Sequence, residues 1–185
     1  LCALAVMHLF VLIPLVLPAD TFGPYTYTIT DGQATITSFD RTYSGTLSIT
    51  NKLGGYPVTS IGDYAFSSCY SLASVTISGG VTSIGAGFLW IASLTSVAIP
   101  VGVTNIGESA FSSCSSLPSI TIPNSVTTIG DDAFRDCSSL IVVTIPVGVT
   151  SIGFSAFSWC ESLVFVTIPD SVTNIGKWAF NTCTS

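Results

Sequence analysis

Charged side chains are scarce in this chain. Of its 185 residues, four are Lys or Arg and ten are Asp or Glu, which makes 8% of the sequence and a net charge of −6. An ordinary soluble domain carries roughly a quarter charged residues. Nucleic-acid binding needs Lys and Arg clustered against the phosphates. Four scattered cations in an acidic chain therefore exclude a nucleic acid as the partner.

Long apolar runs are also missing beyond residue 19, although hydrophobic residues make up 48% of the chain. Ser, Thr and Gly interrupt the apolar residues every two or three positions. A helix that spans a membrane needs about 20 consecutive apolar residues. We therefore expect no membrane-spanning segment after residue 19.

Histidine occurs once, at His8 in the apolar N-terminal segment. A Ser or Cys nucleophile needs a positioned base, and beyond that segment the only lysines are Lys52 and Lys177. No Cys-x-x-Cys pair and no phosphate-binding loop occurs. We therefore expect a protein that is not an enzyme, without catalytic residues, and that binds no metal and no cofactor.

Residues 1–19 are uncharged and almost wholly apolar, and Asp20 begins the polar part of the chain. Pro14 would break a spanning helix. The segment is typical of the apolar region of a secretory signal peptide that is cleaved after Ala19, although Leu17 is not the small residue preferred three positions before the cut. The alternative is an N-terminal membrane anchor. We expect a secreted or cell-surface protein whose signal peptide is truncated at its start.

A repeat of 22 or 23 residues organises the chain over residues 58–185, and its unit reads V-T-x-I-G-x-x-A-F-x-x-C-x-S-L-x-x-V-x-I-P. One copy cannot bury its own apolar faces, so stacked copies must share a continuous core, which predicts a solenoid. The sixth copy ends incomplete at Ser185, where we expect a second truncation. An Ile-Gly pair marks every copy, at Ile61-Gly62, Ile84-Gly85, Ile106-Gly107, Ile129-Gly130, Ile152-Gly153 and Ile175-Gly176.

Each part of the unit predicts a local structure. The L-x-x-V-x-I segment, as at residues 72–77, predicts a strand whose Val and Ile point to one face. The proline that follows most copies ends that strand. The glycine after each Ile is expected in a turn with positive φ. The Ala65-Phe66 pair and its equivalents predict a short helical turn with the phenylalanine in the core.

Residues 20–57 differ from the repeats. Alternating segments flank Asp31-Gly32, which is a strong signal for a β-hairpin. Leu47 and Ile49 form a degenerate repeat strand, and an insertion follows them. We therefore expect residues 20–57 to be an N-terminal β cap with a degenerate first repeat that shields the first coil.

The repeat resembles the BspA-type leucine-rich repeat, whose pattern is L-x-x-V-x-I-P-x-x-V-x-x-I-G-x-x-A-F-x-x-C, over residues 58–185. The resemblance implies an α/β fold: a right-handed solenoid with a parallel β-sheet on its concave face and short helical turns on its convex side. Similar proteins are secreted or surface-exposed in bacteria and some protists. Several of them are adhesins that bind matrix proteins or other cells, and the family has no catalytic motif.

Five cysteines share one repeat position. Secretion makes disulfides possible, but parallel side chains on adjacent coils have poor bridging geometry, and five is an odd number. We therefore expect a column of buried thiols that act as small hydrophobic side chains. The column consists of Cys69, Cys114, Cys137, Cys160 and Cys183.

Two columns of predicted strand residues should face outward on the concave side and form the candidate binding site. One column changes from Ser to Val142 and then to Phe165, and exposed apolar residues in a hydroxyl-lined groove mark a contact patch. The alternative is packing of these residues against a missing C-terminal segment. The candidate residues are Ser74, Thr76, Ser96, Ser119, Thr121, Val142, Thr144, Phe165 and Thr167.

These features favour a monomeric, secreted or cell-surface binding or adhesion module that recognises an extracellular protein or glycan through its concave face. One alternative is a structural spacer for a missing C-terminal domain. Another is a binder of an ordered surface, such as ice or a glycan lattice, through an unbroken threonine column; the simpler interpretation of that column is hydrogen bonding along the stack. The column consists of Thr59, Thr82, Thr104, Thr127, Thr150 and Thr173.

Overall fold

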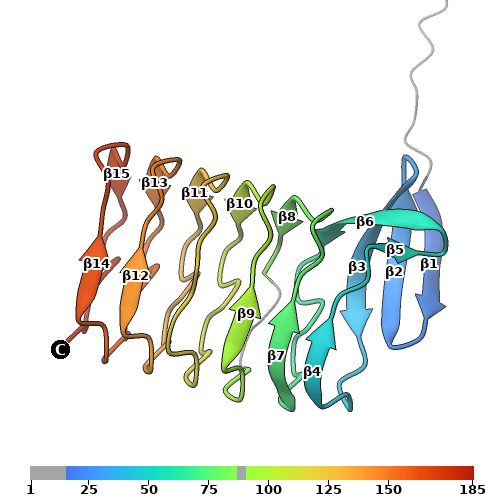
Figure 1. The fold of residues 1–185 in the computed structure, drawn as a ribbon, viewed down its shortest axis with the longest axis horizontal. Coiled ribbons are helices and arrows are strands. Elements are labelled where there is room, and N and C mark those ends of the chain that lie inside the picture. Colours follow the sequence, from blue (N-terminus) through green and yellow to red (C-terminus); the bar gives the residue numbers. More distant parts are fainter. Residues whose placement is uncertain (1–15, 87–90) are drawn as a thin grey trace, which may run out of the picture.

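The computed structural model describes residues 16–86 and 91–185, which form a stack of β coils closed at the N-terminal end by antiparallel strands (Figure 1). His8 lies outside the described residues. Each coil from residue 58 onward places its Ile-Gly pair directly beside that of the previous coil, as Ile84 pairs with Ile61. The predicted solenoid is therefore confirmed.

One ten-stranded sheet runs the length of the stack, in the order β1-β2-β3-β6-β8-β10-β11-β13-β15, with β5 paired to β6. Its pairings are parallel from β3 to β15 and antiparallel within the cap. The strands are β1 (Val16–Phe22), β2 (Tyr25–Thr30), β3 (Gln33–Phe39), β5 (Lys52–Leu53), β6 (Tyr56–Ile61), β8 (Ser83–Ile84), β10 (Asn105–Ile106), β11 (Thr128–Ile129), β13 (Ser151–Ile152) and β15 (Asn174–Ile175).

The L-x-x-V-x-I segments form a second row of parallel strands. It comprises a three-stranded sheet of β4 (Gly45–Ser48), β7 (Leu72–Thr76) and β9 (Ser96–Ala98), and a two-stranded sheet of β12 (Val142–Thr144) and β14 (Phe165–Thr167). We call the outward surface of these strands, together with the coil between the two sheets, the strand face (Figure 1).

The row is interrupted at the coil between β9 and β12, which makes one bridge, Ser119 to Val142. In the flanking coils, the residue at the repeat position of Pro118 donates its backbone amide to the preceding coil. Thr95 donates to the carbonyl of Ala73 at 2.8 Å, and Ile141 donates to the carbonyl of Pro118 at 3.0 Å. Pro118 has no N–H to donate. The proline therefore explains why this coil is not a regular strand.

The turn segments between the two rows contain no helix, so the predicted short helical turns are wrong for residues 16–86 and 91–185. Nor does this part of the chain hold a helix long and apolar enough to cross a membrane. Alternate amides of each turn donate to the next coil rather than along their own segment, which is incompatible with an i to i−4 ladder. Examples are Ser109 to Asp131 at 2.8 Å, Phe111 to Ala133 at 2.8 Å and Ser113 to Arg135 at 2.7 Å.

The repeated glycines are required by close packing and not, as predicted, by positive φ. A Cβ on Gly153 would lie 2.4 Å from the carbonyl carbon of Gly130 and 2.5 Å from the amide nitrogen of Asp131. The left-handed conformation instead occurs two residues later, at Ser109, Asp132 and their equivalents. The glycine lets adjacent backbones approach, and the residue two positions after it takes the unusual φ.

The core is a continuous column of apolar side chains inside the coils. Its centre is a stack of nearly parallel phenylalanines: Phe111 and Phe134 have ring centroids 5.3 Å apart, and Phe134 and Phe157 are 5.1 Å apart. Phe180 extends this stack at 5.3 Å. The predicted core role is confirmed for Phe66, Phe111, Phe134 and Phe157, while Phe180 is partly buried. Phe88 lies outside the described residues.

The cap confirms the predicted hairpin, since β2 and β3 pair across Asp31 and Gly32, which both have positive φ. Tyr25, Tyr27 and Phe39 are buried over the first coil. Strand β1, which pairs with β2, was not predicted, and its register shifts between Leu17 and Asp20. The predicted cleavage after Ala19 therefore falls at this irregularity.

Candidate binding site

The structure brings the predicted site residues together on the strand face. Ser74 pairs in register with Ser96 between β7 and β9, and Val142 pairs with Phe165 between β12 and β14. Thr144 likewise lies beside Thr167. Ser119 and Thr121 lie on the interrupted coil between these two groups, and Ser119 bridges to Val142. The nine residues therefore follow one face along five consecutive coils.

At its C-terminal part this face becomes apolar. Val142 and Phe165 are 43% and 60% exposed. Their chain neighbours Ile141 and Val164 are 47% and 67% exposed, and the amide of Val164 donates to the carbonyl of Ile141 at 3.0 Å. We call these four residues the apolar patch. Val142 and Phe165 lie on the adjacent strands β12 and β14, and Ile141 and Val164 directly precede these strands. An exposed apolar cluster of this kind marks an interaction surface.

Ile141 and Val164 were missed by the sequence analysis. They precede the strands and follow a buried leucine, so strand alternation alone does not give their direction. The signal that would have found them is the change along their own repeat column, from Ala73 and Thr95 through Pro118 to these two residues.

Beside the apolar patch lies a shallow hollow of about 220 Å³. Its lining includes Thr121 and Thr144 from the candidate site, together with Asn124 and Pro146. It adjoins the interrupted coil, and its hydroxyl and amide groups add hydrogen-bonding capacity next to an apolar surface. Apolar surface with a few convergent polar groups is typical of a recognition site.

The threonine column uses its hydroxyl protons within the stack. The Oγ1 of Thr127 donates to the carbonyl of Thr104 at 3.1 Å, and the Oγ1 of Thr173 donates to the carbonyl of Thr150 at 3.3 Å. The first member, Thr59, donates to Oε1 of Gln33 at 3.0 Å. These bonds give the column a structural role between coils.

The cysteine column is buried and free of disulfides, as expected: Cys69, Cys114, Cys137 and Cys160 are buried thiols, and Cys183 is half-buried. Burial raises the pKa of the Cys69 thiol to about 11 and the pKa of Cys114 to about 12. The thiolate is the reactive form of cysteine, so these groups are held in the unreactive thiol state at neutral pH.

The acidic cluster around residues 131–136 also has structural partners. Asp131 Oδ1 accepts a hydrogen bond from the amide of Phe154 at 2.6 Å, and Asp132 Oδ1 lies 3.5 Å from Nη1 of Arg135. In the described part of the chain, no three Cys, His, Asp or Glu side chains form a group suited to holding a metal ion.

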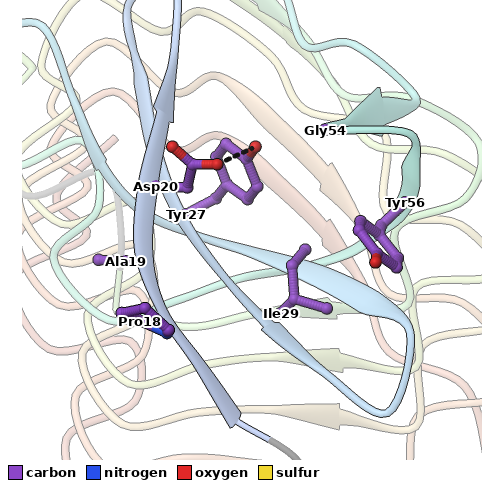
Figure 2. A pocket seen from close by; sticks show the side chains of 7 residues that line it. All are labelled: Pro18, Ala19, Asp20, Tyr27, Ile29, Gly54 and Tyr56. Atoms are coloured by element: carbon purple, nitrogen blue, oxygen red, sulfur yellow. Dashed lines mark hydrogen bonds between the residues drawn. The ribbon is translucent and has the colours of Figure 1, made fainter.

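The cap contains a hollow of about 390 Å³ between β1, β2 and the β5–β6 hairpin (Figure 2). The hydroxyl of Tyr27 donates to Oδ2 of Asp20 at 3.3 Å, and burial together with the Asp20 charge raises the pKa of Tyr27. Gly54 has a φ of +57°, and a Cβ there would lie 2.5 Å from the Tyr27 hydroxyl. Cleavage after Ala19 would remove part of the wall of this hollow, because Pro18 and Ala19 line it.

Three solved structures are similar to this chain. A leucine rich cell surface protein of Faecalibacterium prausnitzii is 40% identical with a TM-score of 0.80, over 89% of this chain and 46% of that one. A leucine-rich repeat protein of Bacteroides ovatus is 32% identical with a TM-score of 0.80, over 89% of this chain and 45% of that one. The T. pallidum leucine rich repeat protein is 25% identical with a TM-score of 0.76, over 90% of both chains.

This chain thus spans less than half the length of the F. prausnitzii and B. ovatus proteins. A comparison with curated proteins gives no match. The model of the BspA type leucine rich repeat region matches residues 59–185 in six copies. The chain therefore belongs to the BspA type leucine-rich repeat family.

Proposed function

We propose that this protein is a non-enzymatic binding or adhesion module of the cell surface or the extracellular space, which recognises its partner through the strand face. The observation that carries the proposal is the apolar patch of Ile141, Val142, Val164 and Phe165. At the equivalent strand positions of β7 and β9 the chain carries Ser74 and Ser96, so the fold itself does not require apolar side chains there.

A protein surface is the partner that this patch suits best. Its apolar centre is flanked along the same face by Thr144 and Thr167, and the hollow lies beside it. An apolar centre with a polar, solvent-accessible border is the usual anatomy of a protein interface. Family membership and the similar cell-surface protein of F. prausnitzii support a location outside the cell.

The state of the described cysteines also supports a binding role. The cysteine thiols are buried with raised pKa values, and the only histidine lies outside the described residues. A nucleophile would need both an exposed reactive group and a base within hydrogen-bonding reach. The described cysteines do not meet the first condition.

The proposal is tested by a binding screen of the purified protein against matrix proteins, cell-surface glycans and intact cells. We expect a saturable interaction that Phe165→Asp and Val142→Asp each weaken at least tenfold. Val101→Asp is the matched control, because Val101 is 82% exposed and lies in the turn after β9, outside the apolar patch. An interaction that both patch variants leave unchanged would contradict the site, and no interaction would favour a structural spacer.

A further inference from the structure

The turn segments that follow the Ile-Gly pairs in the last coils form a surface separate from the strands of the strand face. A groove of about 400 Å³ is lined there by seven residues, three of them aromatic. We call it the turn groove. Its lining residues are Arg135, Phe154, Ser155, Ser158, Trp159, Trp178 and Asn181.

The three aromatic side chains of the groove are exposed to solvent, and the turn can form without them. Phe154, Trp159 and Trp178 are 38%, 42% and 55% exposed, and the ring centroids of Phe154 and Trp178 are 5.3 Å apart with an interplanar angle of 56°. The preceding coil carries Asp131 and Asp136 where Phe154 and Trp159 stand, and it forms the same turn. The three rings therefore contribute to the surface of the turn rather than to its folding.

Two of these rings occupy costly backbone positions. Trp159 and Trp178 have φ values of 63° and 64°, in the left-handed region that bulky side chains avoid. The same positions of the preceding coil hold Asp136 and Ser155, and small polar residues tolerate this conformation better. The repeat imposes this backbone conformation on each described coil, so the notable feature of the groove is that two bulky aromatic residues occupy it.

The remaining lining residues determine which ligand fits. Ser155 and Ser158 are 5% and 3% exposed, and Asn181 adds an amide at the side. An anchor such as a leucine or phenylalanine side chain would cover these polar groups without giving them a hydrogen-bond partner, which costs binding energy. A pyranose ring has an apolar C–H face for the indole and phenyl rings and hydroxyls at its edge for the serines and the amide.

The charges around the groove favour an uncharged ligand. The guanidinium of Arg135 lies 3.5 Å from the Asp132 carboxylate, and the Nζ of Lys177 lies 4.3 Å from the ring centroid of Trp178. Both cations beside the groove thus already have a partner, and the acidic chain around them repels anions.

We propose that the turn groove is a carbohydrate-binding site that holds a neutral oligosaccharide, with Trp159 and Trp178 against successive sugar rings and with Ser155, Ser158 and Asn181 bonded to their hydroxyls. The site is separate from the strand face. The protein would then bind two different ligands on two faces. The sugar site in the turn groove does not depend on the partner proposed for the apolar patch.

The test is titration of the full chain with neutral hexasaccharides of β-1,4-linked glucose, xylose, mannose and N-acetylglucosamine, followed by tryptophan fluorescence and calorimetry. Two of the three tryptophans lie in the groove, so binding changes the emission. We expect at least one sugar to bind saturably. Trp178→Ser and Trp159→Asp, which introduce residues that the preceding coil carries, should each lower the affinity at least tenfold.

Tyr64→Ser is the matched control. Tyr64 is 60% exposed, has a φ of 58° and occupies the repeat position of Trp178, but it lies outside the groove. This variant and Phe165→Asp should bind the sugar like the unchanged protein. The proposal is overturned if none of the four sugars binds, or if both tryptophan variants bind the sugar as well as the unchanged protein does. It is also overturned if the tryptophan variants lose only the binding of a protein partner from which the glycans have been removed.

Discussion

The thiol of Cys160 donates a hydrogen bond to the carbonyl oxygen of Phe134 in the preceding coil, with a sulfur–oxygen distance of 3.2 Å. The Cys137 thiol makes the same contact with Phe111 at 3.2 Å. The repeated cysteine thus connects neighbouring coils beside the stacked phenylalanines, which explains why a small side chain with one weak donor suits this position.

Replacing this thiol should weaken the stack. We expect Cys160→Ala to lower the free energy of unfolding by about 1–3 kcal/mol, because it leaves a cavity and removes one of the two hydrogen bonds that the Phe134 carbonyl accepts. Urea unfolding followed by circular dichroism measures the change. Cys183→Ala is the control: that residue makes the equivalent bond to Phe157 at 3.3 Å but is only half-buried, so its loss should be smaller. Equal losses would contradict the explanation.

The buried thiols should also make the protein less stable in alkali. Burial raises the pKa of Cys114 from 9.0 to about 12, so above pH 9 the unfolded chain loses this proton while the folded chain keeps it. The stability that the group contributes is therefore complete below pH 9 and is lost as the pH rises toward 12.

We expect the unfolding free energy to fall above pH 9, with Cys114 contributing at most about 1.4 kcal/mol per pH unit. Urea titrations at intervals between pH 8 and 11 measure this slope. Cys114→Ala should reduce the slope while leaving its sign unchanged, because Cys69 shifts in the same direction. A slope that Cys114→Ala does not alter would show that this thiol does not titrate as proposed.

A Cβ on the repeated glycine should disrupt the contact between coils. In Gly153→Ala the new atom would lie 2.4 Å from the backbone of Gly130, and we expect a loss of about 3 kcal/mol or more. Gly79→Ala is the matched control, since no atom lies within 4 Å of its Cβ position. Thermal unfolding should show Gly79→Ala unchanged or slightly stabilised. Equal effects of the two changes would contradict the role of close packing.

The inward-facing positions could be predicted from the sequence because each repeats at a fixed spacing. Their apolar side chains can be buried only in the core inside the coils. Phe134, Cys137 and Leu140 lie in the core as expected. The turn between Gly130 and Leu140 could not be predicted in the same way. Its Ala-Phe pair favours a helix locally, but hydrogen bonds to the next coil, such as Phe134 to Ala156 at 2.7 Å, replace the helical ones.

The surface was harder to predict than the core. Val142 and Phe165 were identified because they interrupt a column of serines on a predicted strand. Ile141 and Trp159 were not identified. Ile141 precedes a strand, and Trp159 lies in a turn and has a left-handed φ that its own residue type does not indicate. Side-chain direction at such positions depends on stacking between coils, which a single repeat does not encode.

The most direct test of the proposed function is to compare Phe165→Asp with Val101→Asp for both urea unfolding and binding to the partner found in the screen. Both side chains are exposed, at 60% and 82%, so neither change should shift the unfolding midpoint. We predict that Phe165→Asp loses at least tenfold in affinity while Val101→Asp binds normally. Equal binding by the two variants, with both folded, would contradict recognition through the strand face.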